Sequence, residues 1–213
     1  FYVVSLASLG VLGIIMGGWS ANNKYTLIGG LRSAAQMISY EIPLVLSVVA
    51  VVILAGSLDM KTLVQTQAHY RWYVFWVPVG PLAFAIYLTA AVAETNRVPF
   101  DLPEAESELV CGFHTEYSGM KFAFFFLAEF TNTFAISCIA TTLFLGGWLG
   151  PGREGPWWFL LKTYAVVFFV MWLRWTFPRV RGDQLMKLAW KVLLPSSLVV
   201  VLFASVMAAL GVG

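Results

Sequence analysis

Long apolar runs alternate with short polar segments along the whole chain. Six runs reach or approach the roughly 20 residues needed to cross the hydrocarbon core of a bilayer. None of them alternates as a strand would, so helices rather than a barrel would satisfy the backbone hydrogen bonds. The runs cover residues 1–18, 42–58, 72–92, 122–145, 157–175 and 192–212. The pattern predicts an all-α polytopic membrane protein, a helical bundle with about six transmembrane helices.

Composition supports this class. Hydrophobic residues make up 60% of the 213 residues and charged residues 11%, and the mean hydropathy is +0.80. A soluble domain of this size could hardly bury so much apolar surface. We therefore expect one helical membrane domain over residues 1–213. The chain opens at Phe1 inside an apolar run, without a methionine or basic n-region, so we interpret it as a fragment lacking an N-terminal part.

Lysine and arginine are unevenly distributed among the connections between the runs. The first, third and fifth connections hold Lys24, Arg32, Arg97, Lys121, Arg174, Arg179, Arg181, Lys187 and Lys191. The second and fourth hold only Lys61, Arg71 and Arg153. By the positive-inside rule, the odd connections face the cytoplasm or the mitochondrial matrix.

The third connection, an acidic loop at residues 93–121, concentrates carboxylates beside the end of a predicted span. They are Glu94, Asp101, Glu104, Glu106, Glu108 and Glu116, and only Arg97 and His114 lie among them. Crowded carboxylates resist simultaneous ionisation, so some would keep a proton, as proton-handling chemistry requires. The alternative is a solvated acidic loop.

An Asp-x-x-Glu pattern in this loop, Asp101 and Glu104, resembles a capping box that begins a short helix. A helix over residues 102–111 would place Asp101, Glu104 and Glu108 on one face and Glu106 on the other. We therefore predict an ordered acidic element.

Three charged residues fall within or beside predicted spans. Glu41 lies about 180° round a helix from Arg32, so it needs a partner on another helix or a proton, and both alternatives stay open. Glu129 would lie about 16 Å into its helix, where a charge costs roughly 2.5 to 3.5 kcal/mol, and we favour a proton relay over packing. Lys162 lies near the far interface, where it could snorkel.

Cysteine and histidine limit the cofactors. Cys111 and Cys138 lie on separate segments without a C-x-x-C motif, so an iron-sulfur or zinc site is not expected. His69 and His114 would fall on opposite sides of the membrane, which argues against a shared haem. With no nucleotide-binding fingerprint either, we expect no metal, haem, flavin or iron-sulfur cluster in this chain. Any redox group would be a diffusible molecule or belong to another protein chain.

Several segments resemble one known family. The stretch NRVPFDLPEAESELVCGFHTEY is similar to the third cytoplasmic loop of the H subunit of respiratory complex I, the NADH:quinone oxidoreductase. The stretches GWSANNKYTLIGGLRSAAQMISYE, TTLFLGGW and LRWTFPRVRGDQL agree with it. The resemblance covers essentially the whole chain, although the family has two earlier helices and a long first loop.

This resemblance implies a quinone-binding membrane subunit without a redox centre of its own, in which ubiquinone or menaquinone is reduced near the cytoplasmic face. The implied quinone-binding residues are Arg32, Arg97, Phe100 and Arg181. The implied proton-handling residues are Glu41, Glu94, Asp101, Glu104, Glu106, Glu108 and Glu129. The implied partners are peripheral-arm iron-sulfur subunits, neighbouring membrane subunits and lipid, with no nucleic acid.

The implied location is the bacterial inner membrane or, alternatively, the mitochondrial inner membrane. Two other functions stay open. One is the membrane anchor of a related hydrogenase or ferredoxin-linked complex. The other is a stand-alone proton-coupled transporter, which the lack of an apparent internal repeat makes less attractive.

Overall fold

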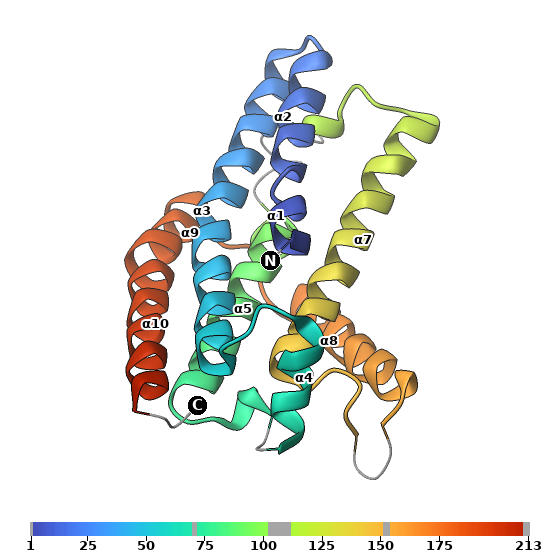
Figure 1. The fold of residues 1–213 in the computed structure, drawn as a ribbon. Coiled ribbons are helices and arrows are strands. Elements are labelled where there is room, and N and C mark those ends of the chain that lie inside the picture. Colours follow the sequence, from blue (N-terminus) through green and yellow to red (C-terminus); the bar gives the residue numbers. More distant parts are fainter. Residues whose placement is uncertain (1, 70–71, 102–111, 151–153, 211–213) are drawn as a thin grey trace.

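The computed structural model describes residues 2–69, 72–101, 112–150 and 154–210, and it is helical with no strand over these ranges. Figure 1 shows the elements in chain order. They are α1 (Tyr2–Ala7), α2 (Gly10–Ser20), α3 (Lys24–Ala55), α4 (Met60–His69), η1 (Tyr73–Phe75), α5 (Val79–Glu94), η2 (Gly112–His114), α7 (Gly119–Phe144), α8 (Pro156–Thr176), α9 (Gly182–Leu188), η3 (Ala189–Leu193) and α10 (Leu194–Ala209).

Within the described ranges, four helices are long and apolar enough to cross a membrane: α3, α7, α8 and the continuous helix Gly182–Ala209 formed by α9, η3 and α10. Two shorter apolar helical segments, Ser5–Ser20 and Val79–Glu94, accompany them. Each of the six predicted runs therefore coincides with an apolar helix. The prediction of an all-α polytopic membrane protein is confirmed, although two of the six helices fall short of a full span.

Three of the helices begin at other residues than the apolar runs that they contain. The second span begins at Lys24, ahead of the run that starts at residue 42, because the more polar segment before that run belongs to the same helix of 32 residues, which is capped by the Asn23 side chain. The third begins at Val79 rather than residue 72, since Pro78 occupies its N-cap and η1 precedes it. The last begins at Gly182 rather than residue 192. Polar side chains end a hydropathy run without ending a helix.

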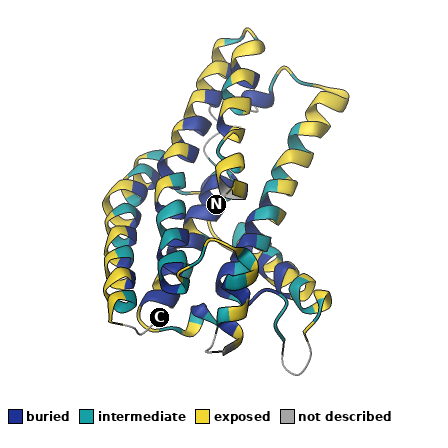
Figure 2. Cartoon of the chain, in the orientation of Figure 1, coloured by how far each residue is buried: buried dark blue, intermediate teal, exposed yellow. Residues whose placement is uncertain are grey.

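Helix α3 is the centre of the packing, with α2, α5 and α10 against it. Its buried face includes Tyr40, which is fully buried and whose hydroxyl donates to the carbonyl of Leu185 in α9 (2.8 Å). Figure 2 shows that burial is concentrated on the facing sides of the helices, while the outer sides are exposed. Those outer sides carry large apolar residues such as Phe124 and Leu202, as expected for a surface that meets lipid or other membrane subunits.

Candidate functional site

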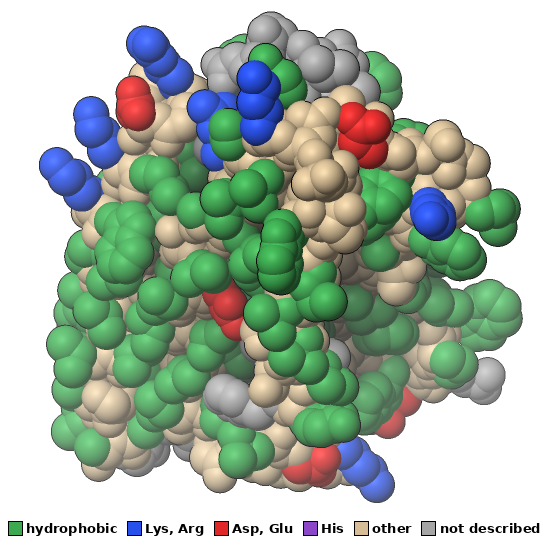
Figure 3. Space-filling view, turned by 90° about the horizontal axis from the view of Figure 1, so that it is seen from above, with side chains coloured by type: hydrophobic (Ala, Val, Ile, Leu, Met, Phe, Trp, Pro, Cys, Tyr) green, Lys and Arg blue, Asp and Glu red, His purple; other side chains and the backbone are tan. Residues whose placement is uncertain are grey.

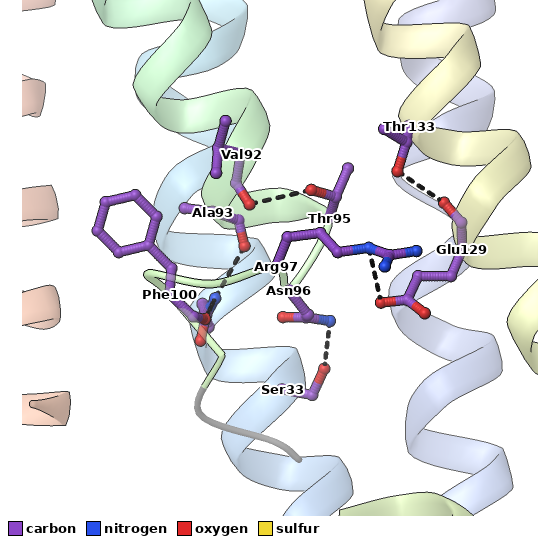
Figure 4. Close-up of polar contacts among 10 residues, drawn as sticks. Ser33, Val92, Ala93, Thr95, Asn96, Arg97, Phe100, Glu129 and Thr133 are labelled. Carbon is purple, nitrogen blue, oxygen red and sulfur yellow. Dashed lines mark hydrogen bonds and ion pairs between the residues drawn. The ribbon is translucent and has the colours of Figure 1, made fainter. Parts of the chain in front are cut away.

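The carboxyl end of α5 leads into a tight turn over residues 95–100, which we call the 95–100 turn. The Thr95 hydroxyl donates to the carbonyl of Val92 (3.0 Å), and Asn96 adopts the left-handed conformation with φ 51°. The Asn96 amide donates to the hydroxyl of Ser33 on α3 (3.0 Å). Figure 4 shows the result: Arg97 and Phe100 extend in opposite directions from this turn.

Arg97 reaches across from the 95–100 turn to α7. Its Nε lies 3.4 Å from Oε1 of Glu129, and its guanidinium carbon lies 4.4 Å from the centre of the Phe130 ring. The side chains of Arg97 and Glu129 are 5% and 20% exposed. This is a largely buried ion pair, and removing one partner of a buried pair costs about 3–5 kcal/mol. The sequence analysis singled out both residues but did not pair them.

Two further carboxylates belong to the helices that hold the 95–100 turn. Glu94 is 7% exposed at the end of α5, and Glu41 of α3 is near enough for the two charges to repel each other. No described side chain forms a salt bridge with either of them. Within the described ranges, the alternative in which Glu41 pairs with an arginine of another helix therefore finds no support. Glu94 and Glu41 thus form a pair of neighbouring carboxylates.

A second set of candidate residues lines an open groove of about 570 Å³ beside α3 and α9. Arg32 comes from α3, and Arg179 and Arg181 come from the segment that precedes α9. Figure 3 shows lysine and arginine gathered along one edge of this end of the molecule. The four implied quinone-binding residues thus fall in two places, Arg32 and Arg181 in the groove, and Arg97 and Phe100 in the 95–100 turn.

One backbone contact joins these two places. The N–H of Val180, between the groove arginines, donates to the carbonyl of Pro99 (2.9 Å). On the other side of the turn, Phe100 packs against Tyr40 of α3 with ring centres 5.9 Å apart. The turn is therefore held between α3 and the segment before α9.

Of the remaining acidic candidates, only Asp101 belongs to the described residues. Asp101 is partly buried at the end of a described range. Glu104, Glu106, Glu108 and the predicted helix over residues 102–111 lie outside the described residues, so the facial arrangement stays a prediction. Among the described residues no three His, Cys, Asp or Glu side chains come together as a metal site would require.

Lys162 of α8 has a different environment from the expected one. Instead of snorkelling to the interface it is 8% exposed, and its ammonium donates to the carbonyls of Leu145 (2.6 Å), Gly147 (3.3 Å) and Leu149. It also lies 4.2 Å from the centre of the Trp72 ring. The cation thus compensates the negative end of the α7 dipole, which is a structural role.

Sequence reasoning also missed Gln36, a fully buried side chain of α3 that bonds to Ala93, at the end of α5, and to Phe100, at the end of the 95–100 turn. Its position among the buried residues Ser33, Met37 and Tyr40 is the signal that could have marked it. A polar residue on the buried face of a helix needs a partner there.

Comparison with known proteins gives consistent matches. A family model described as NADH dehydrogenase matches residues 1–205. The chain is similar to the H subunit of NADH-quinone oxidoreductase from Geobacillus kaustophilus (strain HTA426), with 56% identity over 98% of this chain and 62% of that protein. It is similar to the protein of the same name from Bacillus mycoides (strain KBAB4), with 55% identity over 92% of this chain and 59% of that protein. The chain spans about three fifths of the length of these curated relatives.

Proposed function

Since this chain belongs to the NADH dehydrogenase family, we propose that it works as the quinone-side membrane component, the H subunit, of a proton-translocating NADH:quinone oxidoreductase. The observation that carries the proposal is the group of charges around the 95–100 turn: the Arg97–Glu129 ion pair and the carboxylates Glu41 and Glu94, which form no salt bridge with any described side chain. When a charge changes nearby, a carboxylate of such a group can respond by binding a proton.

The quinone head group would lie against the 95–100 turn, near Phe100 and Arg97. Reduction of a quinone to a quinol consumes two electrons and two protons, and the electrons would come from iron-sulfur clusters of partner subunits. A negative charge that develops on the quinone competes with Glu129 for the guanidinium of Arg97. Glu129 then binds a proton more readily, which converts a redox event into a protonation.

Glu94 and Glu41 extend this response into the membrane domain. We expect Glu94, which is buried and lies near the charge of Glu41, to be the carboxylate that binds a proton, and a change of charge at Arg97 would alter how readily it does so. Asp101, Glu104, Glu106 and Glu108 would supply protons from the cytoplasmic side. Arg32 and Arg181 would line the approach to the quinone site.

The relatives are named as quinone oxidoreductase subunits, which favours the quinone enzyme over a hydrogenase anchor or a separate transporter. The proposed partners are the other subunits of such a complex, including peripheral iron-sulfur subunits on the cytoplasmic side. Four helices long enough to span a membrane and bacterial relatives favour a multi-pass protein of the bacterial inner membrane.

Glu129→Gln tests this function in membranes that carry the complete complex. The amide keeps the shape of the side chain and removes its ionisable group. We expect lower quinone-linked turnover and proton translocation, while ferricyanide reduction by the peripheral arm stays normal because that acceptor bypasses the quinone. Co-purification with the partner subunits reports assembly.

Glu116→Gln is the matched control, because Glu116 is an exposed carboxylate near the same end and bonds to the Asn23 amide (2.7 Å). It should leave turnover unchanged. If Glu129→Gln and Glu94→Gln both behaved like Glu116→Gln, the proton role proposed for this group would be wrong.

A further inference from the structure

Gln36 links the carboxyl end of α5 to the last residue of the 95–100 turn with a single amide. Its Nε2 donates to the carbonyl of Ala93 (2.8 Å) and to the carbonyl of Phe100 (2.6 Å). Because one nitrogen makes both bonds, the two carbonyl oxygens can be no farther apart than 5.4 Å, the sum of the two distances. The side chain therefore fixes how tightly the turn is closed.

The orientation of this amide is determined by its partners. Both groups that face Nε2 are carbonyl oxygens, which only accept hydrogen bonds, so the NH₂ end of the amide must point at them. Gln36 meets neither solvent nor lipid, at 0% exposure, and Ala93 is equally buried. If the amide is removed, two buried carbonyls lose a donor that water does not readily replace.

The residues between the two bonded carbonyls are those that the proposed function uses. Glu94 follows Ala93 directly, Arg97 lies in the middle of the turn, and Phe100 closes it. A change in the separation of the ends would move all three side chains together. It would also alter the 3.4 Å contact between Arg97 and Glu129.

A neighbouring contact holds the same turn to the same face of α3. Ser33, three residues before Gln36, accepts a hydrogen bond from the Asn96 amide (3.0 Å). Residues three apart lie side by side on a helix surface. The turn is thus attached to α3 at its beginning, middle and end.

We infer that Gln36 is a positioning residue for the quinone-side chemistry. It does not touch the reacting atoms in this proposal. Its two hydrogen bonds fix the positions of Phe100 and Arg97 relative to Glu94. The inference rests on the proposed function and adds a residue to it.

The chain contains a closely matched control for this role. Gln67 is 2% exposed, and its Nε2 also donates to two carbonyls of another helix end, those of Thr142 (3.1 Å) and Leu143 (3.2 Å). It lies on α4 near the beginning of α5, whereas the 95–100 turn follows the carboxyl end of α5. Gln67 also donates to the carbonyl of Leu63 (3.2 Å) and accepts from the N–H of Tyr73 (3.3 Å), so Gln67→Met removes at least as many bonds from a buried site as Gln36→Met does.

The experiment compares these two variants in the complete complex with a short-chain quinone as substrate. We expect Gln36→Met to raise the KM for quinone and to lower kcat, with ferricyanide reduction unchanged. Gln67→Met should leave both quinone parameters at the parent values even where it lowers thermal stability. Equal effects of the two substitutions on KM and kcat would overturn the positioning role.

Two milder variants keep the inference testable if Gln36→Met fails to assemble. Gln36→Asn keeps the amide but shortens the side chain by one methylene, so it cannot reach both carbonyls, and Ser33→Ala removes only the bond to Asn96. Both should raise the KM for quinone, and parent values in both would refute the inference. If Glu94→Gln and Glu129→Gln lower turnover while the Gln36 variants do not, the positioning role fails and the proposed function stands.

Discussion

The Arg97–Glu129 ion pair is open to a quantitative test by a double-mutant cycle. At 3.4 Å, unit charges in a medium with an effective dielectric constant of about 20 attract each other by about 5 kcal/mol. Desolvation offsets much of this attraction, so the net value of the pair is smaller. Arg97→Met should nevertheless lower the free energy of unfolding by about 3–5 kcal/mol, since it leaves the Glu129 carboxylate without its guanidinium.

The double variant Arg97→Met with Glu129→Leu should cost less than the sum of the two single substitutions. In the double variant neither charge is left alone, so we expect a coupling energy of about 1–3 kcal/mol. The cation–π contact between Arg97 and the Phe130 ring contributes about 0.5–2 kcal/mol. Arg97→Met removes this contact whether or not Glu129 is also substituted, so the contact does not contribute to the coupling energy.

Unfolding of the purified full-length protein by SDS in mixed micelles would measure these free energies. Glu116→Gln is the reference for an exposed carboxylate and should cost under about 1 kcal/mol. Additive costs, with a coupling energy near zero, would refute the view that the two side chains stabilise each other.

Three further predictions concern the rest of the chain. Glu41→Gln and Glu94→Gln should leave assembly intact and lower quinone-linked turnover, and unchanged proton translocation in either would remove that residue from the relay. Single cysteines at the exposed positions Glu116 and Lys61 should react with an impermeant maleimide from opposite sides of sealed vesicles, whereas labelling from one side would contradict the topology. Lys162→Met should destabilise the protein by at least about 2 kcal/mol in the same SDS titration, because three carbonyls lose a charged donor, and parent stability would show that these bonds contribute nothing.

The helices were predictable because a membrane span needs only length and apolar composition. All six apolar runs lie in helices. The residues at which these helices begin and end depend on capping and turn residues, which a hydropathy profile does not detect. Lys24 begins α3 because Asn23 caps it, and Val79 begins α5 because Pro78 precedes it. Those two boundaries required turn and capping signals rather than a count of apolar residues.

The candidate site was predictable as a set of residues and not as an arrangement. Glu129 attracted attention because a carboxylate within a span is costly, but its partner Arg97 lies 32 positions earlier in another connection, and no periodicity links the two. Gln36 passed unnoticed because its importance comes from two main-chain carbonyls, which have no signature in the sequence. The acidic helix over residues 102–111 stays a prediction.

The environment of Lys162 has a consequence for how the protein enters the membrane. An ammonium group facing lipid costs roughly 2.5 to 3.5 kcal/mol on insertion scales, and here it is covered by residues 145–149 and by Trp72. All of these covering groups precede Lys162 in the chain, so they are synthesised before it. If α8 inserts into the membrane together with α7 as a hairpin, the ammonium of Lys162 is already bonded to the carbonyls that follow α7. These carbonyls are available in time because the ribosome synthesises them before α8.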